Sequence, residues 1–439
     1  MSVHRRSIAQ AALSLAVAVA LAACSQEAAG PASGAAPKEA ARAAPAASQG
    51  APAAQGGATS GTPVRIGMIH ERTGPLAMYG EAGARAVELV VEELNASGGL
   101  LGRPIEVIYR DSKAQQDEAV RQARDLLLSE KVDFLLQNIN SGECLGVSEV
   151  AKEAQRILLS SCAADELTGT AGHRYAFRIP NITSRTQGQA AAQYAADRLG
   201  QFQTVYTVSN DYTAGRAIVD HFRTKLKELR PDVQFVGESW PKFGETDYSP
   251  YVAAAQNQRA DVTFYFMATA IPFFNQAVPL NLHKQTQLLS AYWGGVDEMA
   301  VLKQESIPEG AVMGGFPWYA LPSDVNKRFV EKYRAKTNQA PRGSSYFQHI
   351  TLQFLAEAIR KAGTTDTEKV VDALEGLEID SIAGKARIRP FDHQGATPHW
   401  MGKARWDPTM GIGVVTDLIQ LESEQFLPTE AEVRQMRGQ

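Results

Sequence analysis

The sequence predicts an α/β protein of two similar lobes, each a mostly parallel sheet between two layers of helices. Two observations support this prediction. From residue 63 onward, short apolar runs alternate with segments of helical period, the pattern of parallel strands joined by crossover helices. The alternation passes through two series, over residues 64–160 and 174–304, and a chain of 439 residues is long enough to bury two cores.

Residues 1–24 have the pattern of a lipoprotein signal peptide. Arg5 and Arg6 precede an apolar run over residues 8–21, which is too short and alanine-rich for a good membrane span. The closing Leu21-Ala22-Ala23-Cys24 resembles the bacterial lipobox, so we expect Cys24 to be lipidated and the protein to be periplasmic and membrane-anchored. An ordinary signal peptide with an incidental cysteine is the alternative. In a Gram-negative cell, Ser25 after the cysteine favours the outer membrane.

Residues 25–62 consist almost wholly of Ala, Pro, Gly, Ser and Gln. Without large apolar residues this segment cannot offset the entropy of ordering, so we expect a disordered tether. Its r.m.s. reach would be roughly 35 Å.

The folded part begins with residues 64–102, around which the first lobe is organised. An apolar run over residues 64–69 predicts a strand, Thr73-Gly74-Pro75 a turn, and the following segment a helix that ends at Ser97-Gly98-Gly99. In open α/β sheets, ligands bind beyond the carboxyl ends of the strands. We therefore expect residues 70–80 to form one wall of a binding site, with Tyr79 in contact with the ligand.

The remaining elements follow in order. In the first series we expect strands at 105–110, 132–138 and 157–160 and helices at 117–129 and 141–154. In the second we expect strands at 174–179, 204–209, 233–238, 261–267 and 287–292, and helices at 184–199, 214–229, 248–258, 272–280 and 296–304. Beyond them we expect strands at 311–316, 385–390, 400–406 and 414–421 and helices at 323–338, 344–362 and 367–377.

The residues after 304 are too few for a third lobe, so the chain is expected to return between the two lobes. Crossings near residues 177–180, 314–318 and 386–390 would make a three-crossover hinge. This assigns residues 63–178 plus 315–388 to lobe 1 and residues 179–314 plus 389–428 to lobe 2, with residues 429–439 as a C-terminal tail.

Composition and motifs exclude several functions. A formal net charge of −4 offers no basic surplus for nucleic acid. There is no G-x-S-x-G, H-E-x-x-H or P-loop, so we expect neither enzymatic activity nor a cofactor. His393 and His399 lack the spacing and the cysteine partner of a metal site and are interpreted as surface or interlobe residues. The charged residues of 85–93 and 327–336 are interpreted as solvated helix faces.

Several short motifs in a fixed order carry a family resemblance. They include Thr73-Gly74-Pro75 with Tyr79-Gly80, Asn95-Ala96-Ser97-Gly98-Gly99, Asp211-Tyr212 with Gly215, Asp247-Tyr248-Ser249, and Arg389-Pro390-Phe391-Asp392-His393-Gln394. Over residues 64–421 the chain resembles the type I periplasmic solute-binding proteins of ABC transporters, in the leucine/isoleucine/valine-binding branch. The resemblance implies two lobes joined by three crossovers, which close over a solute and hand it to a membrane permease.

The resemblance also implies ligand contacts in the first lobe. It places the aromatic that covers the ligand at Tyr79, and a hydroxyl and backbone N–H for a carboxylate at Ser141. Further contacts fall on Cys162, Ala163 and Ala164. The alternative for Ser141 is a plain helix N-cap, which is compatible with ligand binding.

In the second lobe the sequence departs from the family. Amino-acid binders carry a Glu for the ligand's ammonium where this chain has Tyr292-Trp293-Gly294-Gly295, and Asp297 is interpreted as the start of the next helix. A buried ammonium without a carboxylate would be costly, which leaves room for a neutral or aromatic carboxylate; Asp211 or Glu143 remain possible charge partners. Further candidate contacts, for which core or rim packing is the alternative, are Tyr212, Ala268, Trp293 and Tyr346.

Cys144 and Cys162 follow two strands expected to be neighbours. In an oxidising compartment such a pair suggests a disulfide that stiffens the first-lobe wall, and two buried thiols are the alternative.

These expectations combine into one function. The chain is expected to be the solute-binding component of an ABC importer of the branched-chain amino acid or amide type, which captures a small carboxylate-bearing solute. Its expected partners are that solute and an inner-membrane permease, and the protein itself is expected to be a monomer. The alternative is a ligand sensor of the same fold that signals to a receptor or regulator.

Overall fold

The computed structural model describes residues 60–439. The predicted signal peptide, the lipidation site Cys24 and the predicted tether up to residue 59 lie outside the described residues. Within residues 60–439, no helix combines the length and the apolar character needed to cross a membrane.

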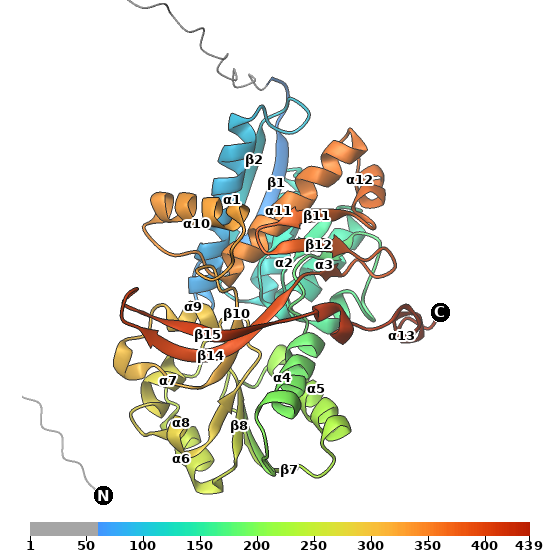
Figure 1. Ribbon diagram of the computed structural model, residues 1–439. Coiled ribbons are helices and arrows are strands. Elements are labelled where there is room, and N and C mark those ends of the chain that lie inside the picture. Colours follow the sequence, from blue (N-terminus) through green and yellow to red (C-terminus); the bar gives the residue numbers. More distant parts are fainter. Residues whose placement is uncertain (1–59) are drawn as a thin grey trace, which may run out of the picture. The chain divides into compact units, whose positions relative to one another are not determined.

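The first large sheet is wholly parallel, because its strands are joined by crossover helices (Figure 1). Its interior strand β1 is buried on both faces, as expected for the near-continuous apolar run at its start. Ile66 and Met68 point to one core and Ile69 to the other. The strands, in spatial order, are β2 (Ile105–Asp111), β1 (Val64–His70), β3 (Phe134–Gln137), β4 (Leu158–Ser160) and β5 (Ala176–Arg178).

The second large sheet is parallel from β10 to β7 and ends in an antiparallel hairpin, β14–β15. The prediction of mostly parallel sheets is therefore confirmed. The strands, in spatial order, are β15 (Ile412–Leu421), β14 (His399–Asp407), β10 (Val312–Gly315), β9 (Gln287–Leu289), β8 (Val262–Phe266), β6 (Thr204–Ser209) and β7 (Gln234–Ser239).

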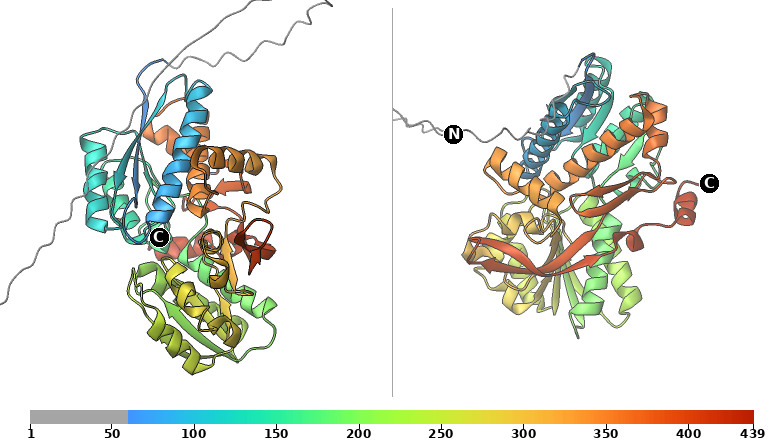
Figure 2. Two further views of the ribbon diagram at one scale, coloured as in Figure 1. Left: turned by 90° about the vertical axis from the view of Figure 1, so that its left-hand side faces the viewer. Right: turned by 45° about the horizontal axis from the view of Figure 1, so that its top comes forward.

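Helices cover the two large sheets and define two lobes (Figure 2). Around the first sheet, the first lobe contains α1 (Ala77–Ala96), α2 (Gln116–Leu128), α3 (Ser141–Glu153), α10 (Asp324–Thr337), α11 (Gly343–Ala362) and α12 (Thr367–Leu374). Around the second sheet, the second lobe contains α4 (Ser184–Arg198), α5 (Thr213–Leu229), α6 (Ser249–Gln258), α7 (Ile271–Ala277), α8 (Leu282–Gln285) and α9 (Gly295–Met299).

The chain passes between the lobes after β5, after β10 and after a small third sheet. That sheet contains β11 (Glu378–Ser381), β12 (Gly384–Ile388) and β13 (Gly395–Ala396). The 3₁₀ helices are η1 (Asp165–Leu167), η2 (Gln304–Ser306) and η3 (Ser423–Phe426).

Three expectations about local structure need correction. The helix expected at 296–304 ends at Met299, and only the 3₁₀ turn η2 follows. The expected C-terminal tail contains helix α13 (Glu430–Met436), which begins with a capping box at Thr429. His393 and His399 are not surface residues, because their exposed fractions are only 7% and 5%.

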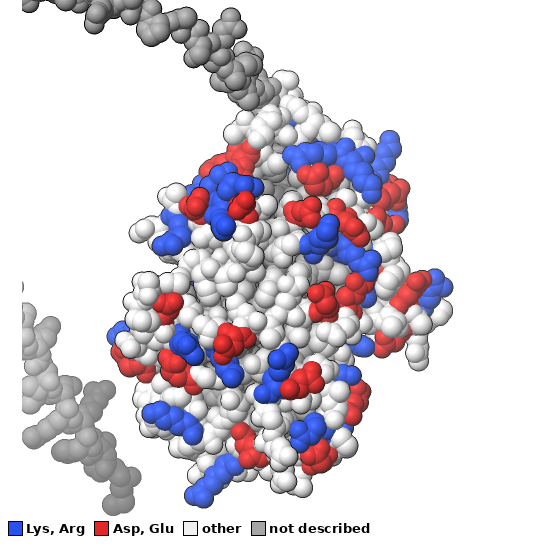
Figure 3. All heavy atoms as spheres, in the orientation of Figure 1, with Lys and Arg blue, Asp and Glu red and all other residues white. Residues whose placement is uncertain are grey.

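The charged helix faces of α1 and α10 are exposed but also pair with each other. Lys332 Nζ lies 2.6 Å from Glu93 Oε1, and Lys336 pairs with Glu92. On the face drawn in Figure 3, basic and acidic side chains form mixed clusters, and the middle of the view is largely uncharged.

Candidate functional site

Tyr79 of the first lobe reaches directly into the second lobe. The turn after β1 contains Gly74, whose φ of 91° is readily adopted only by glycine, and Pro75; the turn brings Tyr79 into the first turn of α1. The ring is fully buried. Its Oη lies 2.7 Å from Tyr292 Oη and donates a hydrogen bond to Glu298 Oε1 at 3.0 Å. The residue that we expected to cover the ligand thus forms the contact between the two lobes.

The second-lobe side of this contact is built from the carboxyl ends of three parallel strands. Tyr292, after β9, donates to the carbonyl oxygen of Ala268, after β8, at 2.9 Å. The amide of Ala268 in turn donates to Asn210 Oδ1, after β6, at 2.8 Å. This is the edge at which open α/β sheets bind ligands, and Ala268 lies within it as predicted.

Aromatic rings surround the contact. The Trp293 ring centroid lies 4.9 Å from that of Tyr79 and 5.0 Å from that of Phe347 on α11, in edge-to-face geometry. Tyr346 stacks on Phe316 at 4.7 Å. Trp293, Tyr346, Phe347 and Phe316 also line a cavity of about 20 Å³ beside the crossovers. A cavity of that size holds little more than one water molecule.

Glu298 is a site residue that the sequence reasoning missed. It is fully buried, and its Oε1 accepts hydrogen bonds from Tyr79 Oη and from the amide of Ala270 at 2.7 Å. Its Oε2 has no hydrogen-bond partner among residues 60–439. Burial raises the pKa of Glu298 to about 8. The second lobe therefore carries a buried carboxyl group at the lobe contact, while the absence of a Glu at the family's ammonium position stays a prediction.

A local signal could have revealed Glu298. Gly294 and Gly295 permit a tight turn, and a short helix that starts at Gly295 places residue 298 one turn later, near the strand ends again. The expected start of the helix at Asp297 lies one residue before it.

Asp297 makes a second contact between the lobes. Its two carboxylate oxygens accept from the amide of Gly343 at 2.9 and 2.7 Å, at the N-terminus of the long helix α11. Burial raises the pKa of Asp297 to about 7, against the opposing effects of Arg342 and of the Gly343 amide. A carboxylate from one lobe therefore binds the positive end of a helix dipole from the other.

A buried polar layer lies at the strand ends of the first lobe. Glu71 accepts from Asn138 Nδ2 at 2.7 Å and from the amides of Ile139 and Asn140 at 3.2 and 3.0 Å. Gln348 Nε2 on α11 donates to Asn138 Oδ1 at 3.3 Å and to Ser161 Oγ at 3.2 Å. The sequence analysis predicted none of these contacts, because they join positions that are far apart in the chain.

The N-cap of α3 is Asn140 and not Ser141. The Asn140 side chain accepts from the amides of Gly142 and Glu143, and Ser141 is the first helical residue and is buried. The N-cap alternative for Ser141 is therefore wrong, and its role in carboxylate binding stays a prediction.

Neither Glu143 nor Asp211, the two alternative charge partners for a ligand ammonium, is suited to pair with one. Both carboxyl oxygens of Glu143 are buried and have no hydrogen-bond partner in the described part of the chain, and burial together with the nearby Glu71 raises the pKa of Glu143 to about 9. Glu143 is therefore protonated at neutral pH. Asp211 is exposed and pairs with Arg216 at 2.8 Å.

Comparison with known proteins places the chain in a family. The profile of the periplasmic binding protein family matches residues 63–408. The chain belongs to the periplasmic binding protein family. It is 27% identical over 344 residues to Leu/Ile/Val-binding protein homolog 7 of Brucella melitensis, covering 75% of this chain and 84% of that protein. The predicted resemblance to the leucine/isoleucine/valine-binding branch is thereby confirmed.

Solved structures share the fold of this binding protein. The substrate-binding protein of an amino acid ABC transporter from Pseudomonas fluorescens Pf-5 superposes with a TM-score of 0.75 at 20% identity, covering 85% of this chain and 99% of that one. A solute-binding protein of an ABC transporter from Rhodopseudomonas palustris BisB5, in complex with 3,4-dihydroxybenzoic acid, has a TM-score of 0.74 at 20% identity. It covers 82% of this chain and 97% of that one. The two-lobed type I fold is confirmed.

In this binding protein the residues after β4, Cys162 to Ala164, form bonds with other residues of the protein. Cys162 is joined to Cys144 in a disulfide, with Cα atoms 6.3 Å apart. The carbonyl oxygen of Ala163 accepts from the amide and hydroxyl of Ser184 at 2.8 and 3.0 Å, and that of Ala164 accepts from Arg178. As ligand contacts, Cys162, Ala163 and Ala164 stay predictions.

Tyr212 belongs to the second-lobe wall of this binding protein. Its ring packs 4.9 Å from Phe243 and 6.3 Å from Phe266, and Phe266 meets Tyr292 edge-to-face at 5.4 Å. Tyr79, Ala268 and Trp293 thus all contact Tyr292 directly. Tyr346 and Tyr212 lie further away from it. Ser141 and Cys162 lie apart, on the first-lobe wall.

Proposed function

We propose that this chain is the extracytoplasmic solute-binding component of an ABC importer, without catalytic activity of its own. It captures a small carboxylate-bearing solute between its lobes and delivers it to an inner-membrane permease, anchored through lipidated Cys24. The observation that carries this proposal is the interlobe contact of Tyr79 with Tyr292 and Glu298, at the carboxyl ends of strands from both sheets.

Solute entry requires these side chains to separate. The cavity of about 20 Å³ beside them is far smaller than leucine or benzoate, and Tyr79 is fully buried. The lobes must therefore open, and a solute that binds both walls favours the closed form by its differential affinity.

The wall composition favours an aromatic acid over an aliphatic amino acid. Tyr79, Trp293 and Phe347 offer ring faces and edges at the lobe contact, where a flat ring could replace their contacts with one another. Of the similar proteins, one is named for leucine, isoleucine and valine, and another holds 3,4-dihydroxybenzoic acid. Glu298 Oε2, which is buried and has no hydrogen-bond partner among residues 60–439, would hydrogen-bond to a hydroxyl or amine of the solute.

A matched ligand screen tests the proposal. Thermal shifts would be measured with benzoate, 4-hydroxybenzoate, 3,4-dihydroxybenzoate, leucine and 4-methylpentanoate, followed by calorimetry on every compound that stabilises. We expect the aromatic acids to stabilise most, and Tyr79→Ala to reduce the thermal shift at equal ligand concentration. Tyr175→Ala is the control, because Tyr175 contacts Glu368 of α12. Stabilisation by leucine alone would contradict the aromatic assignment, and an undiminished thermal shift in Tyr79→Ala would contradict the site.

Delivery to a permease needs its own test. The ligand-loaded protein should co-purify with a membrane permease complex from the source organism. Co-purification with a receptor kinase instead would support the sensor alternative.

A further inference from the structure

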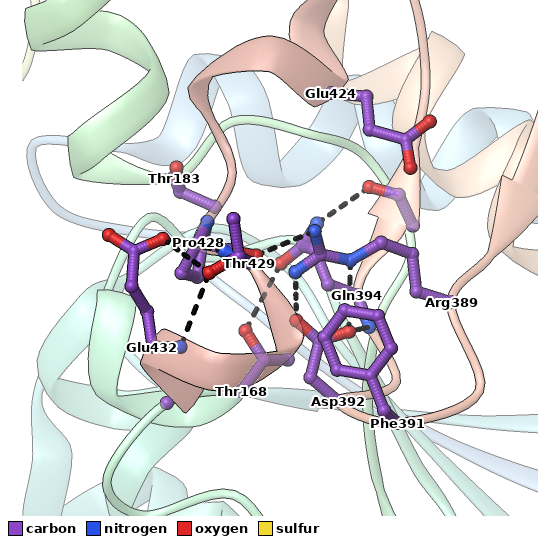
Figure 4. A network of polar contacts seen from close by, with 12 residues as sticks. Thr168, Thr183, Arg389, Phe391, Asp392, Gln394, Glu424, Pro428, Thr429 and Glu432 are labelled. Atoms are coloured by element: carbon purple, nitrogen blue, oxygen red, sulfur yellow. Dashed lines mark hydrogen bonds and ion pairs between the residues drawn. The ribbon is translucent and has the colours of Figure 1, made fainter. Parts of the chain in front are cut away.

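The segment after β15 returns across the hinge side of both lobes. It contains η3 and α13, and its residues 426–437 make polar contacts with three separate parts of the chain. Figure 4 shows the middle of the segment, with Pro428, Thr429 and Glu432 near Arg389 and Asp392. The short helix α13 is rigid at its start, because Thr429 Oγ1 accepts from the amide of Glu432 and Glu432 Oε2 accepts from Thr429.

One end of this segment is attached to the second lobe. Arg185 on α4 donates from Nη2 to Glu432 Oε1 at 3.0 Å and from Nε to the carbonyl oxygen of Phe426 at 3.0 Å. These two bonds hold the start of α13 on the first turn of α4.

The middle of the segment is attached to the third crossover. Arg389 donates from Nη1 to the carbonyl oxygen of Pro428 at 2.9 Å. The remaining guanidinium nitrogens pair with Asp392, and both side chains are almost completely buried. A buried pair of this kind orients its free donor rigidly, here toward the segment.

The far end is attached to the first lobe. Arg437 donates from Nη2 to the carbonyl oxygen of Thr168 at 2.9 Å and from Nε to that of Gly169 at 3.1 Å, in the loop after η1. Its Nη1 donates to the carbonyl oxygen of Phe391 at 3.3 Å. A Cβ at Gly172 would lie 2.2 Å from Arg437 Nη2, so a larger residue there would displace the guanidinium from its present position.

We propose that residues 426–437 form a strap that couples the hinge angle to the cleft. Arg185 moves with the second lobe, whereas Thr168 and Gly169 move with the first. The amide of Arg185 also donates to Asp165 Oδ1 of the first lobe at 3.1 Å, so a hinge rotation that moves α4 away from the loop after η1 strains this bond together with the bonds at the two ends of the seven-residue helix. The strap shifts the equilibrium toward the lobe arrangement in which both sets are made, and so stabilises the Tyr79 contact from the opposite side of the molecule. This inference does not depend on the identity of the solute.

Hydrogen–deuterium exchange of the full-length protein without added ligand tests the strap. In Arg437→Ala we expect at least a fivefold faster exchange both in residues 165–172 and in the cleft segments 76–82 and 292–299. Arg434→Ala is the matched control, because Arg434 lies in the last turn of α13, is exposed and, among residues 60–439, pairs through its side chain with Glu430 alone. It should leave the cleft segments unchanged.

If Arg437 only anchors the loop after η1, a different pattern of hydrogen–deuterium exchange is expected. Faster exchange in residues 165–172 without any change in the cleft would overturn the proposal, as would no change at all. If Arg437→Ala fails to fold, Arg437→Lys and Gly172→Ala test the same coupling, because each disturbs the guanidinium contacts and leaves the helix sequence otherwise intact. Normal cleft exchange in both of these variants would also overturn it.

Discussion

The hydroxyl oxygens of Tyr79 and Tyr292 lie 2.7 Å apart, although 213 positions separate the two residues in the chain. Tyr79 is fully buried and Tyr292 almost fully. Tyr79 also donates a hydrogen bond to Glu298. These three side chains form a contact between the two lobes of the binding protein, and the predictions for Tyr79 rest on this contact.

Replacing Tyr79 with alanine should weaken binding of the identified solute by ~1–3 kcal/mol, through lost stacking and burial. Tyr79→Phe, which keeps the ring and removes the hydroxyl bonds, should lose about 1 kcal/mol. Isothermal titration calorimetry measures both, with Tyr175→Ala as the control. Equal affinity in all four proteins would show that Tyr79 is not in the site.

Replacing Asp297 with alanine should weaken the same binding by roughly 1–2 kcal/mol, because it removes the carboxylate that joins the lobes at Gly343 without touching the aromatic wall. The solute's dissociation rate should rise more than its association rate falls, since closure is what retains it. Stopped-flow tryptophan fluorescence separates the two rates. A change confined to association would argue against a closure contact.

Glu143→Gln should flatten the pH dependence of stability. Burial raises the pKa of Glu143 from its ordinary value to about 9, so the folded state keeps a proton that the unfolded state loses. The free energy of unfolding should therefore fall as pH rises from about 5 to about 9, by up to ~1.4 kcal/mol per pH unit from this group.

Urea unfolding at several pH values checks this prediction. Glu143→Gln should lose part of the slope, whereas Glu153→Gln, an exposed position on the same helix, should keep it. Identical slopes in wild type and Glu143→Gln would show that the carboxyl of Glu143 ionises normally.

The Cys144–Cys162 pair should be oxidised in protein isolated from the periplasm. Intact-mass measurement after alkylation should find no free thiol at either position until a reductant is added. Because the bridge spans 18 residues, Cys144→Ala with Cys162→Ala should reduce the free energy of unfolding by ~2–4 kcal/mol. Two alkylated thiols without reductant would favour the alternative of buried free cysteines.

Much of the fold could be predicted from local patterns. The apolar run of β1, the turn at Gly74 and Pro75, and the glycines after α1 each specify a structure through nearby residues, so their order alone indicates a βαβ chain. Helix ends were harder to predict. α9 stops at Met299, although the apolar pattern continues to Leu302.

The site was only partly predictable. Tyr79 and Trp293 could be named as candidates because a turn and a family position identify them, and both lie at the lobe contact. Glu298, Asp297 and Gln348 could not, because their partners are more than 25 residues away. No periodicity or motif encodes such pairs. Asn140 and Ser141 show the same limit on a smaller scale, because either residue type can cap a helix.

By itself, the sequence determined the alternation of strands and helices, the two series that become two lobes, and the turn that leads to Tyr79. These depend on the periods and turn residues of contiguous segments. Only the tertiary structure decided that a buried carboxylate faces Tyr79 and that a C-terminal helix ties the hinge. Those features form where strand ends and helix ends that are far apart in the sequence come close together in the folded chain. No single segment of the sequence determines which of these ends meet.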